Sequence, residues 1–212
     1  MDVGRVEKLR EDVAFALLES YHIPVFKYKI ANDEVEAVNA AEQIGYPVVA
    51  KIVSTKILHK TDVGGVLLNL NSPKEVREAY RRLSKIGDGV LIQKMAPGGV
   101  EVMVGTTYDE IFEYVIVFGL GGIYTELYRD VSIRIAPIER QDAWDMVRET
   151  KAFHILSGYR GMPPRDVEAV VDILTKFSRL AVERGVIQAD LNPVFVLEKG
   201  AYVADARIII KI

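Results

Sequence analysis

The chain has 212 residues, and 50% of them are hydrophobic, which is enough to bury a core in one large domain or two small lobes. Its formal net charge is only -3, with acids and bases interspersed, so it lacks the basic stripe that follows a nucleic acid backbone. The absence of cysteine excludes disulfides, thiolate metal sites and cysteine nucleophiles. We therefore expect a globular protein without a nucleic acid partner.

The amino-terminal segment, MDVGRVEKLREDVAFALLES, is charged and amphipathic and lacks the apolar core of a signal peptide. No apolar run approaches about 20 residues, the length that spans a membrane, so we expect a cytoplasmic protein. Apolar residues from Val6 to Leu17 recur at helical spacing. They predict a helix near residues 5–20, which ends before Pro24.

Helices and strands alternate after this first helix. ANDEVEAVNAAEQIGYPVVAKIV predicts a helix capped at Asn32 or Asp33, followed by a buried strand that ends on Lys51. VGGVLLNL and GVLIQKM predict two further strands. Between them, SPKEVREAYRRLSKIG predicts a helix that starts at Ser72 with a capping-box pattern. This alternation predicts an α/β lobe that ends near Met95.

A second lobe is predicted after APGG at residues 96–99, because proline and glycine interrupt the periodicity there and indicate a hinge. Two apolar runs and the alternating VSIRIAPI predict strands. RQDAWDMVRETKAF and RDVEAVVDILTKFSRLAVERG predict helices with apolar stripes. The final segment predicts two strands joined by a turn around Lys199 and Gly200.

Two features of the first lobe are suited to binding an anion. Lys51 ends a strand of almost entirely apolar residues, where a phosphate oxygen is a natural partner for a long cation. A lysine that simply reaches solvent at the strand end would leave the same pattern. In DVGG, Gly64 and Gly65 can present backbone N–H groups to an anion, or can form a tight turn into the next strand.

His59 lies between Lys56, Lys60 and Asp62, so it cannot belong to an apolar face. Imidazole is nucleophilic near neutral pH because its ordinary pKa is about 6.5, and a phosphorylated histidine can pass its phosphoryl group onward. Neighbouring cations would stabilise the transferred charge. The alternative is an ordinary exposed loop histidine.

The two terminal strands carry Asp190, Asn192 and Asp205. The turn between these strands can place Asn192 and Asp205 side by side, with Asp190 on the same face. Such oxygen ligands bind Mg2+, whose coordination is completed by water and nucleotide phosphates, although a polar rim on a hairpin is the alternative. Glu101, after the hinge, could accept hydrogen bonds from ribose hydroxyls or be a solvated charge at a sheet edge.

Three motifs, GYPVVAKIVS, HKTDVGGV and DLNP, occur in this order, with FGLGGIYTELYRDVSIRIAPI before the last. Together they resemble the ATP-grasp β subunit of ADP-forming acyl-CoA synthetases of the acetate–CoA ligase type, over nearly the whole chain. Three ordered motifs are far harder to meet by accident than any one. The resemblance implies an α/β, ATP-grasp fold with two α+β lobes and the nucleotide site between them. It divides the chain into an N-terminal helix (1–21) and two subdomains (22–95 and 96–212).

In enzymes of this kind the α subunit binds CoA and makes an acyl phosphate, and the phosphoryl group passes through a histidine of each subunit to ADP. The resemblance implies that His59 is the phosphohistidine of this chain. For nucleotide and metal it implies Lys51 on the phosphates, Gly64 and Gly65 in the phosphate loop, backbone of Gln93, Lys94 and Met95 at adenine, Glu101 on the ribose, and Asn192 and Asp205 on Mg2+. Glu126 and Arg134 fall in segments near the phosphates, without an assigned role.

We therefore expect the nucleotide-binding subunit of an acid–CoA ligase that uses Mg2+ and ATP/ADP and acts only with its α subunit, as an α2β2 heterotetramer. One alternative is the ATP-grasp subunit of a succinate–CoA ligase or related carboxylate ligase. Another is a non-catalytic nucleotide-binding subunit that regulates a partner. The sequence departs from the family pattern at His22, where glycine is usual in YGIPV, and in a short stretch before the hinge strand. We expect it to carry no CoA-binding domain.

Overall fold

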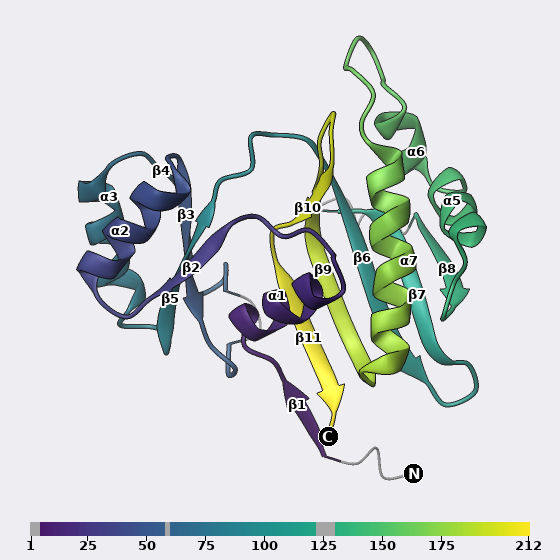
Figure 1. The fold of residues 1–212 in the computed structure, drawn as a ribbon, viewed down its shortest axis with the longest axis horizontal. Coiled ribbons are helices and arrows are strands. Elements are labelled where there is room, and N and C mark those ends of the chain that lie inside the picture. Colours follow the sequence, from purple (N-terminus) through teal and green to yellow (C-terminus); the bar gives the residue numbers. More distant parts are fainter. Residues whose placement is uncertain (1–4, 58–59, 122–129) are drawn as a thin grey trace. The chain divides into compact units, whose positions relative to one another are not determined.

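The structure, a computed structural model, describes residues 5–57, 60–121 and 130–212 (Figure 1). The chain divides into two compact units. Unit 1 contains the chain up to Leu9, Ala14–Val25 and Gly98–Ile212, and unit 2 contains Arg10–Val13 and Phe26–Pro97. The sequence predicts boundaries at 21/22 and 95/96, whereas in the structure the amino-terminal segment is shared between the two units.

Unit 2 is a four-stranded antiparallel sheet with two helices on one face (Figure 1). Its strand order is β2 (Tyr28–Ala31), β5 (Gly89–Lys94), β3 (Val48–Val53) and β4 (Val66–Leu70), and its helices are α2 (Glu34–Ile44) and α3 (Pro73–Leu83). Alternate strand residues such as Ala50, Ile52 and Ile92 pack in the core beneath the helices. The residues between them, including Lys51 and Gln93, therefore point to the other face.

The predicted starts of both helices of unit 2 are confirmed by their caps. The Asp33 side chain accepts a hydrogen bond from the backbone N–H of Glu36, and the Ser72 side chain accepts one from that of Glu75. These bonds satisfy amide groups that a helix amino terminus leaves without intrahelical partners. Helix α2 ends at Gly45, whose φ of 88° lies in the region that favours glycine.

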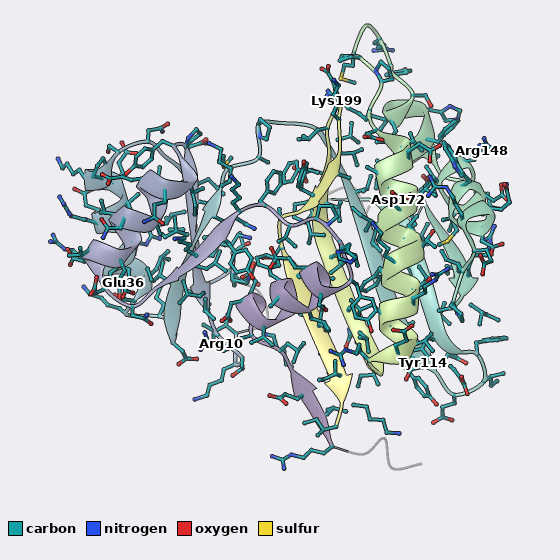
Figure 2. All side chains as sticks on the ribbon, viewed as in Figure 1. Arg10, Glu36, Tyr114, Arg148, Asp172 and Lys199 are labelled. Atoms are coloured by element: carbon teal, nitrogen blue, oxygen red, sulfur yellow. The ribbon has the colours of Figure 1, made fainter. Side chains whose placement is uncertain are left out.

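Unit 1 is a seven-stranded antiparallel sheet in the order β1-β11-β9-β6-β7-β8, with β10 also paired to β9. The strands are β1 (Val6–Lys8), β6 (Val100–Asp109), β7 (Glu113–Leu120), β8 (Val131–Ile135), β9 (Val186–Val196), β10 (Ala201–Val203) and β11 (Ala206–Lys211). Helices α5 (Arg140–Arg148), α6 (Lys151–Leu156) and α7 (Val167–Glu183) pack on this sheet. Figure 2 shows Lys199 at the tip of the β9–β10 hairpin, where the sequence predicts a turn.

Two element predictions are wrong in an instructive way. The helix expected near residues 5–20 is replaced by strand β1, which pairs with β11, and the shorter helix α1 (Glu11–Ser20). The single helix expected over RQDAWDMVRETKAF is broken at Thr150, whose buried hydroxyl donates to the backbone carbonyl of Val147. Edge pairing and a threonine hydroxyl outweigh helical periodicity at these places. In the described part of the chain, no helix is long and apolar enough to cross a membrane.

Candidate nucleotide and phosphoryl-transfer site

Lys51 is buried in the middle of β3 rather than extended into solvent from a strand end. Its Nζ lies 3.2 Å from Oε1 of Glu11, the first residue of α1, and both side chains are less than a tenth exposed. The second carboxylate oxygen of Glu11 accepts a hydrogen bond from Nζ of Lys60. Because a buried ammonium is costly without an anion, this carboxylate supplies the counter-charge that the burial of Lys51 requires.

Glu11 is not recognisable as a partner of Lys51 from the sequence. The residue stands 40 positions before Lys51, within what reads as one amphipathic helix, and no spacing rule joins the two. One signal was available, since Glu11 and Asp12 place two acids in the first turn of α1, where a carboxylate is favoured by the helix dipole. That signal predicts a helix start and not an ion pair with a strand.

Lys51 and Gln93 share the sheet face that is opposite to α2 and α3. Lys51 pairs with Leu91 on β5, and Val49 pairs with Gln93, so the two polar side chains are diagonal neighbours on adjacent strands. Gln93 is 1% exposed, and within the described residues its Nε2 meets no hydrogen-bond acceptor. A buried amide donor without an acceptor is costly, so this face is suited to a polar ligand.

The backbone of the segment from Gln93 to Met95 is largely engaged within unit 2. The amide of Lys94 donates to the carbonyl of Lys27, and the amide of Met95 donates to that of Pro47. The ammonium of Lys94 donates to the carbonyls of Gly45 and Tyr46, where it satisfies the end of α2. The predicted backbone contact of this segment with adenine stays a prediction.

Gly64 and Gly65 form a tight turn into β4. The amide of Gly64 donates to the carbonyl of Thr61 at 3.0 Å, and that of Gly65 donates to the carbonyl of Lys60 at 2.7 Å. Gly64 has a φ of +64°, and a Cβ on Gly65 would lie 2.5 Å from Ile52, so both positions favour glycine for conformational or steric reasons. The conformation is therefore the tight turn, which was the alternative to an anion-binding loop. A role of these two glycines at the phosphates stays a prediction. His59, the predicted phosphohistidine, lies outside the described residues, as does Glu126.

Asn192 and Asp205 occupy facing positions in unit 1. Val203 pairs with Val194, and Ala206 pairs with Leu191. Between these two pairs, Ala204 therefore lies opposite Pro193, and Asp205 lies opposite Asn192. The amide of Ala204 donates to the carbonyl of Pro193 at 3.0 Å and fixes this crossing. The structure thus brings together the two residues that the sequence predicts as Mg2+ ligands.

The donor chemistry of this pair fits Mg2+ held by few protein ligands. An Asp carboxylate and an Asn carbonyl are the hard oxygens that Mg2+ prefers, and this ion usually keeps waters and phosphate oxygens as its other ligands. Among the described residues, no three His, Cys, Asp or Glu side chains cluster in a way that could hold a metal ion. Asp190, on the same strand, lies 3.4 Å from the guanidinium of Arg207.

Glu101 and Arg134 lie on opposite faces of the unit 1 sheet. Glu101 is exposed and alternates with the buried Val102 on β6. Arg134 pairs across the ladder with the buried Ile116, on the other face, and its guanidinium donates to Glu149 after α5. This hydrogen bond, with a second from Ser132, lowers the pKa of Glu149. Arg134 therefore holds the helix layer to the sheet, while Glu101 stays a predicted ribose ligand.

A family model described as an ATP-grasp domain matches residues 4–210 of the chain. The chain belongs to the ATP-grasp family. The resemblance inferred from the motifs is thereby confirmed, and the two antiparallel sheets with their helices are the fold of this family.

Two relatives within the ATP-grasp family show the kind of chain to which this one is similar. The β subunit of acetate–CoA ligase [ADP-forming] I from Pyrococcus furiosus is 45% identical, over 95% of this chain and 91% of that subunit. Acetate–CoA ligase [ADP-forming] II from Archaeoglobus fulgidus is 48% identical over 95% of this chain, but the match spans only 30% of that longer protein. The chain is thus an ATP-grasp domain of the β-subunit type, which can be a separate subunit or part of a larger polypeptide.

A solved structure extends this likeness to three dimensions. Acetyl-coenzyme A synthetase 1 of Ca. Korarchaeum cryptofilum, in complex with coenzyme A and Mg-AMPPCP, matches with a TM-score of 0.87 and 46% identity. The match covers 97% of this chain and 93% of that one. The phosphohistidine segment of the Korarchaeum protein is described as pointing towards its nucleotide-binding site.

Proposed function

We propose that the chain is the nucleotide-binding subunit of an ADP-forming acyl-CoA synthetase, which converts acyl-CoA, ADP and phosphate to acid, CoA and ATP reversibly. The observation that carries this proposal is the match to a separate β subunit of an ADP-forming acetate–CoA ligase over nearly the full length of both chains. The burial of Lys51, which is ion-paired with Glu11 on a sheet face suited to a polar ligand, supports the same conclusion.

The chemistry assigned to this chain is a phosphoryl relay. A partner α subunit would form an acyl phosphate and transfer its phosphoryl group to a histidine of its own, as the bond to the acyl oxygen breaks and the acid leaves. An imidazole nitrogen of His59 would then attack this phosphorus, and the P–N bond to the partner histidine would break. A β-phosphate oxygen of ADP then attacks the phosphorus, the P–N bond breaks and ATP forms. Such transfers depend on positioning and charge neutralisation, which Lys51 supplies at the phosphates. Mg2+, held by Asn192 and Asp205, would neutralise further phosphate charge when bound.

The name of the Pyrococcus relative supports a partner, because a β subunit implies a second subunit. We propose an α subunit that carries the CoA-binding and acyl-phosphate-forming domains, in an α2β2 assembly. ADP and ATP are the proposed nucleotides. The acid is selected by the partner.

The decisive experiment follows the phosphoryl group. The purified chain, alone and with its α subunit, is incubated with Mg2+ and γ-labelled ATP, and acid-labile, base-stable label is counted. We expect label on the wild type and none on His59→Asn. His154→Asn, at an exposed histidine of α6, is the matched control and should label like the wild type. Label that survives in His59→Asn would assign the acceptor to another residue, and a chain that binds no nucleotide would overturn the proposal.

A further inference from the structure

Glu11 is the one buried carboxylate among the described residues, and it contacts two lysines at once. Its side chain is 4% exposed, that of Lys51 is 7% exposed, and that of Lys60 is 17% exposed. These three side chains join the start of α1, the middle of β3 and the turn before β4, and all belong to unit 2. The cluster therefore links three separate parts of the chain at one carboxylate.

Each of these two ion pairs restricts the position of a lysine side chain. Lys51 carries a flexible side chain of four methylenes, and an ion pair at its end restricts where the ammonium can lie. Lys60 directly follows His59 in the sequence, and its carbonyl accepts the amide of Gly65 that closes the turn. Glu11 therefore holds the side chain of Lys60, the residue that follows His59 in the sequence.

An ammonium has three donors, so a lysine that is bound to Glu11 can donate to a phosphate oxygen at the same time. A carboxylate between two ammonium groups also lowers the repulsion between them, and so permits both to stand near one anion. We propose that Glu11 is a positioning residue for phosphoryl transfer: it holds Lys51 and Lys60 together so that both ammonium groups can bind phosphate oxygens. This inference rests on the proposed function of the site.

The test compares two substitutions that each remove one negative charge from the first turn of α1. Glu11→Gln removes the carboxylate that bridges the lysines. Asp12→Asn removes the neighbouring carboxylate, which pairs with the exposed Arg10 (Figure 2), and so controls for net charge and for the helix dipole. Both are measured in the complex with the α subunit, by the rate of phosphohistidine formation from Mg-ATP and by the Kd for ADP.

We expect Glu11→Gln to slow phosphohistidine formation at least about tenfold while the Kd for ADP changes less than about threefold, because lost positioning acts on the transfer more than on binding. Asp12→Asn should keep both values near those of the wild type. A purely structural role would instead lower the amount of folded protein and leave the rate per bound nucleotide unchanged. That result, or equal rates for Glu11→Gln and Asp12→Asn, overturns the inference.

A second variant covers the case in which Glu11→Gln does not fold. Lys60→Gln removes the more exposed arm of the cluster and should also slow the transfer, and in the double variant the two losses should be less than additive. A normal transfer rate in Lys60→Gln overturns the inference. If the wild type itself forms no phosphohistidine, the proposed function has failed, which is a result distinct from any difference between these variants.

Discussion

The two units present their polar residues in opposite ways. In unit 2 the cation Lys51 is buried in a strand and paired with Glu11. In unit 1 Asn192 and Asp205 are only half-buried and lie opposite each other between two ladder pairs, while Glu101 is exposed. Burial makes a charge expensive, so the fold must supply a counterion for Lys51, whereas a half-buried polar side chain keeps part of its hydration. The contrast teaches that unit 2 supplies a buried counterion for its cation, whereas the predicted metal ligands of unit 1 stay partly open to solvent.

The largest effect should follow from breaking the buried cation. Lys51→Met leaves Glu11 with one lysine fewer, so we expect the free energy of unfolding in urea to fall by about 2 kcal/mol. The Kd for ADP should rise by about 30-fold, the equivalent of about 2 kcal/mol. Lys27→Met, at an exposed lysine of the same unit, should change neither quantity. A variant that binds ADP normally would show that Lys51 is only a structural lysine.

A second effect should appear at the oxygen ligands without a loss of stability. Asp205→Asn should raise the Mg2+ concentration for half-maximal activity of the complex by about tenfold, since a carboxylate ligand is replaced by a neutral amide. Asp190→Asn, two residues from Asn192, should change it less than about threefold, because the Asp190 carboxylate is paired with Arg207. Both variants should unfold within about 0.5 kcal/mol of the wild type. The reverse order of the two effects on Mg2+ would assign the metal to Asp190.

Gln93 offers a smaller and subtler test in unit 2. Gln93→Met keeps the length of the side chain but removes a buried amide whose Nε2 has no acceptor among the described residues. We expect the Tm without nucleotide to stay the same or rise, since an uncompensated polar group is removed. The increase in Tm on addition of ADP should shrink. An unchanged increase would exclude the Gln93 side chain from nucleotide binding.

The smallest effect concerns the ion pair between Arg134 on β8 and Glu149, which follows α5. Hydrogen bonds from Arg134 and Ser132 lower the pKa of Glu149 below its ordinary value of 4.5. A lowered pKa means that the pair stabilises the fold above the ordinary pKa, and that this stabilisation is lost as the pH falls through the lowered value. Because Glu149 is half-exposed, Glu149→Gln should lower the Tm at pH 7 by only about 2 °C. The difference should vanish near pH 3, and a constant difference would mean that charge is not involved.

Local signals and motif order predicted much of this protein. Asp33 and Ser72 start their helices as expected, because a cap needs only neighbours in the sequence. The approach of Asn192 to Asp205 was also predictable, because a short hairpin determines which residues face each other.

Long-range contacts account for what could not be predicted. Strand β1 exists because β11, at the far end of the chain, pairs with it, and its three residues fit a helical pattern equally well. Glu11 is hidden for the same reason: its lysines stand 40 and 49 residues away, and a carboxylate in a first helical turn looks like ordinary capping chemistry.

Helix α1 has a consequence for any dissection of the protein. Residues 26–97 form one continuous piece with a complete four-stranded sheet, and they would be the obvious fragment to express alone or to graft. That fragment would carry Lys51 and Lys60 but leave Glu11 behind, because the chain contributes Arg10–Val13 to unit 2 from outside it. A fragment with a complete sheet would thus contain both lysines but not the carboxylate that binds them. The smallest fragment that keeps this cluster must therefore begin before α1.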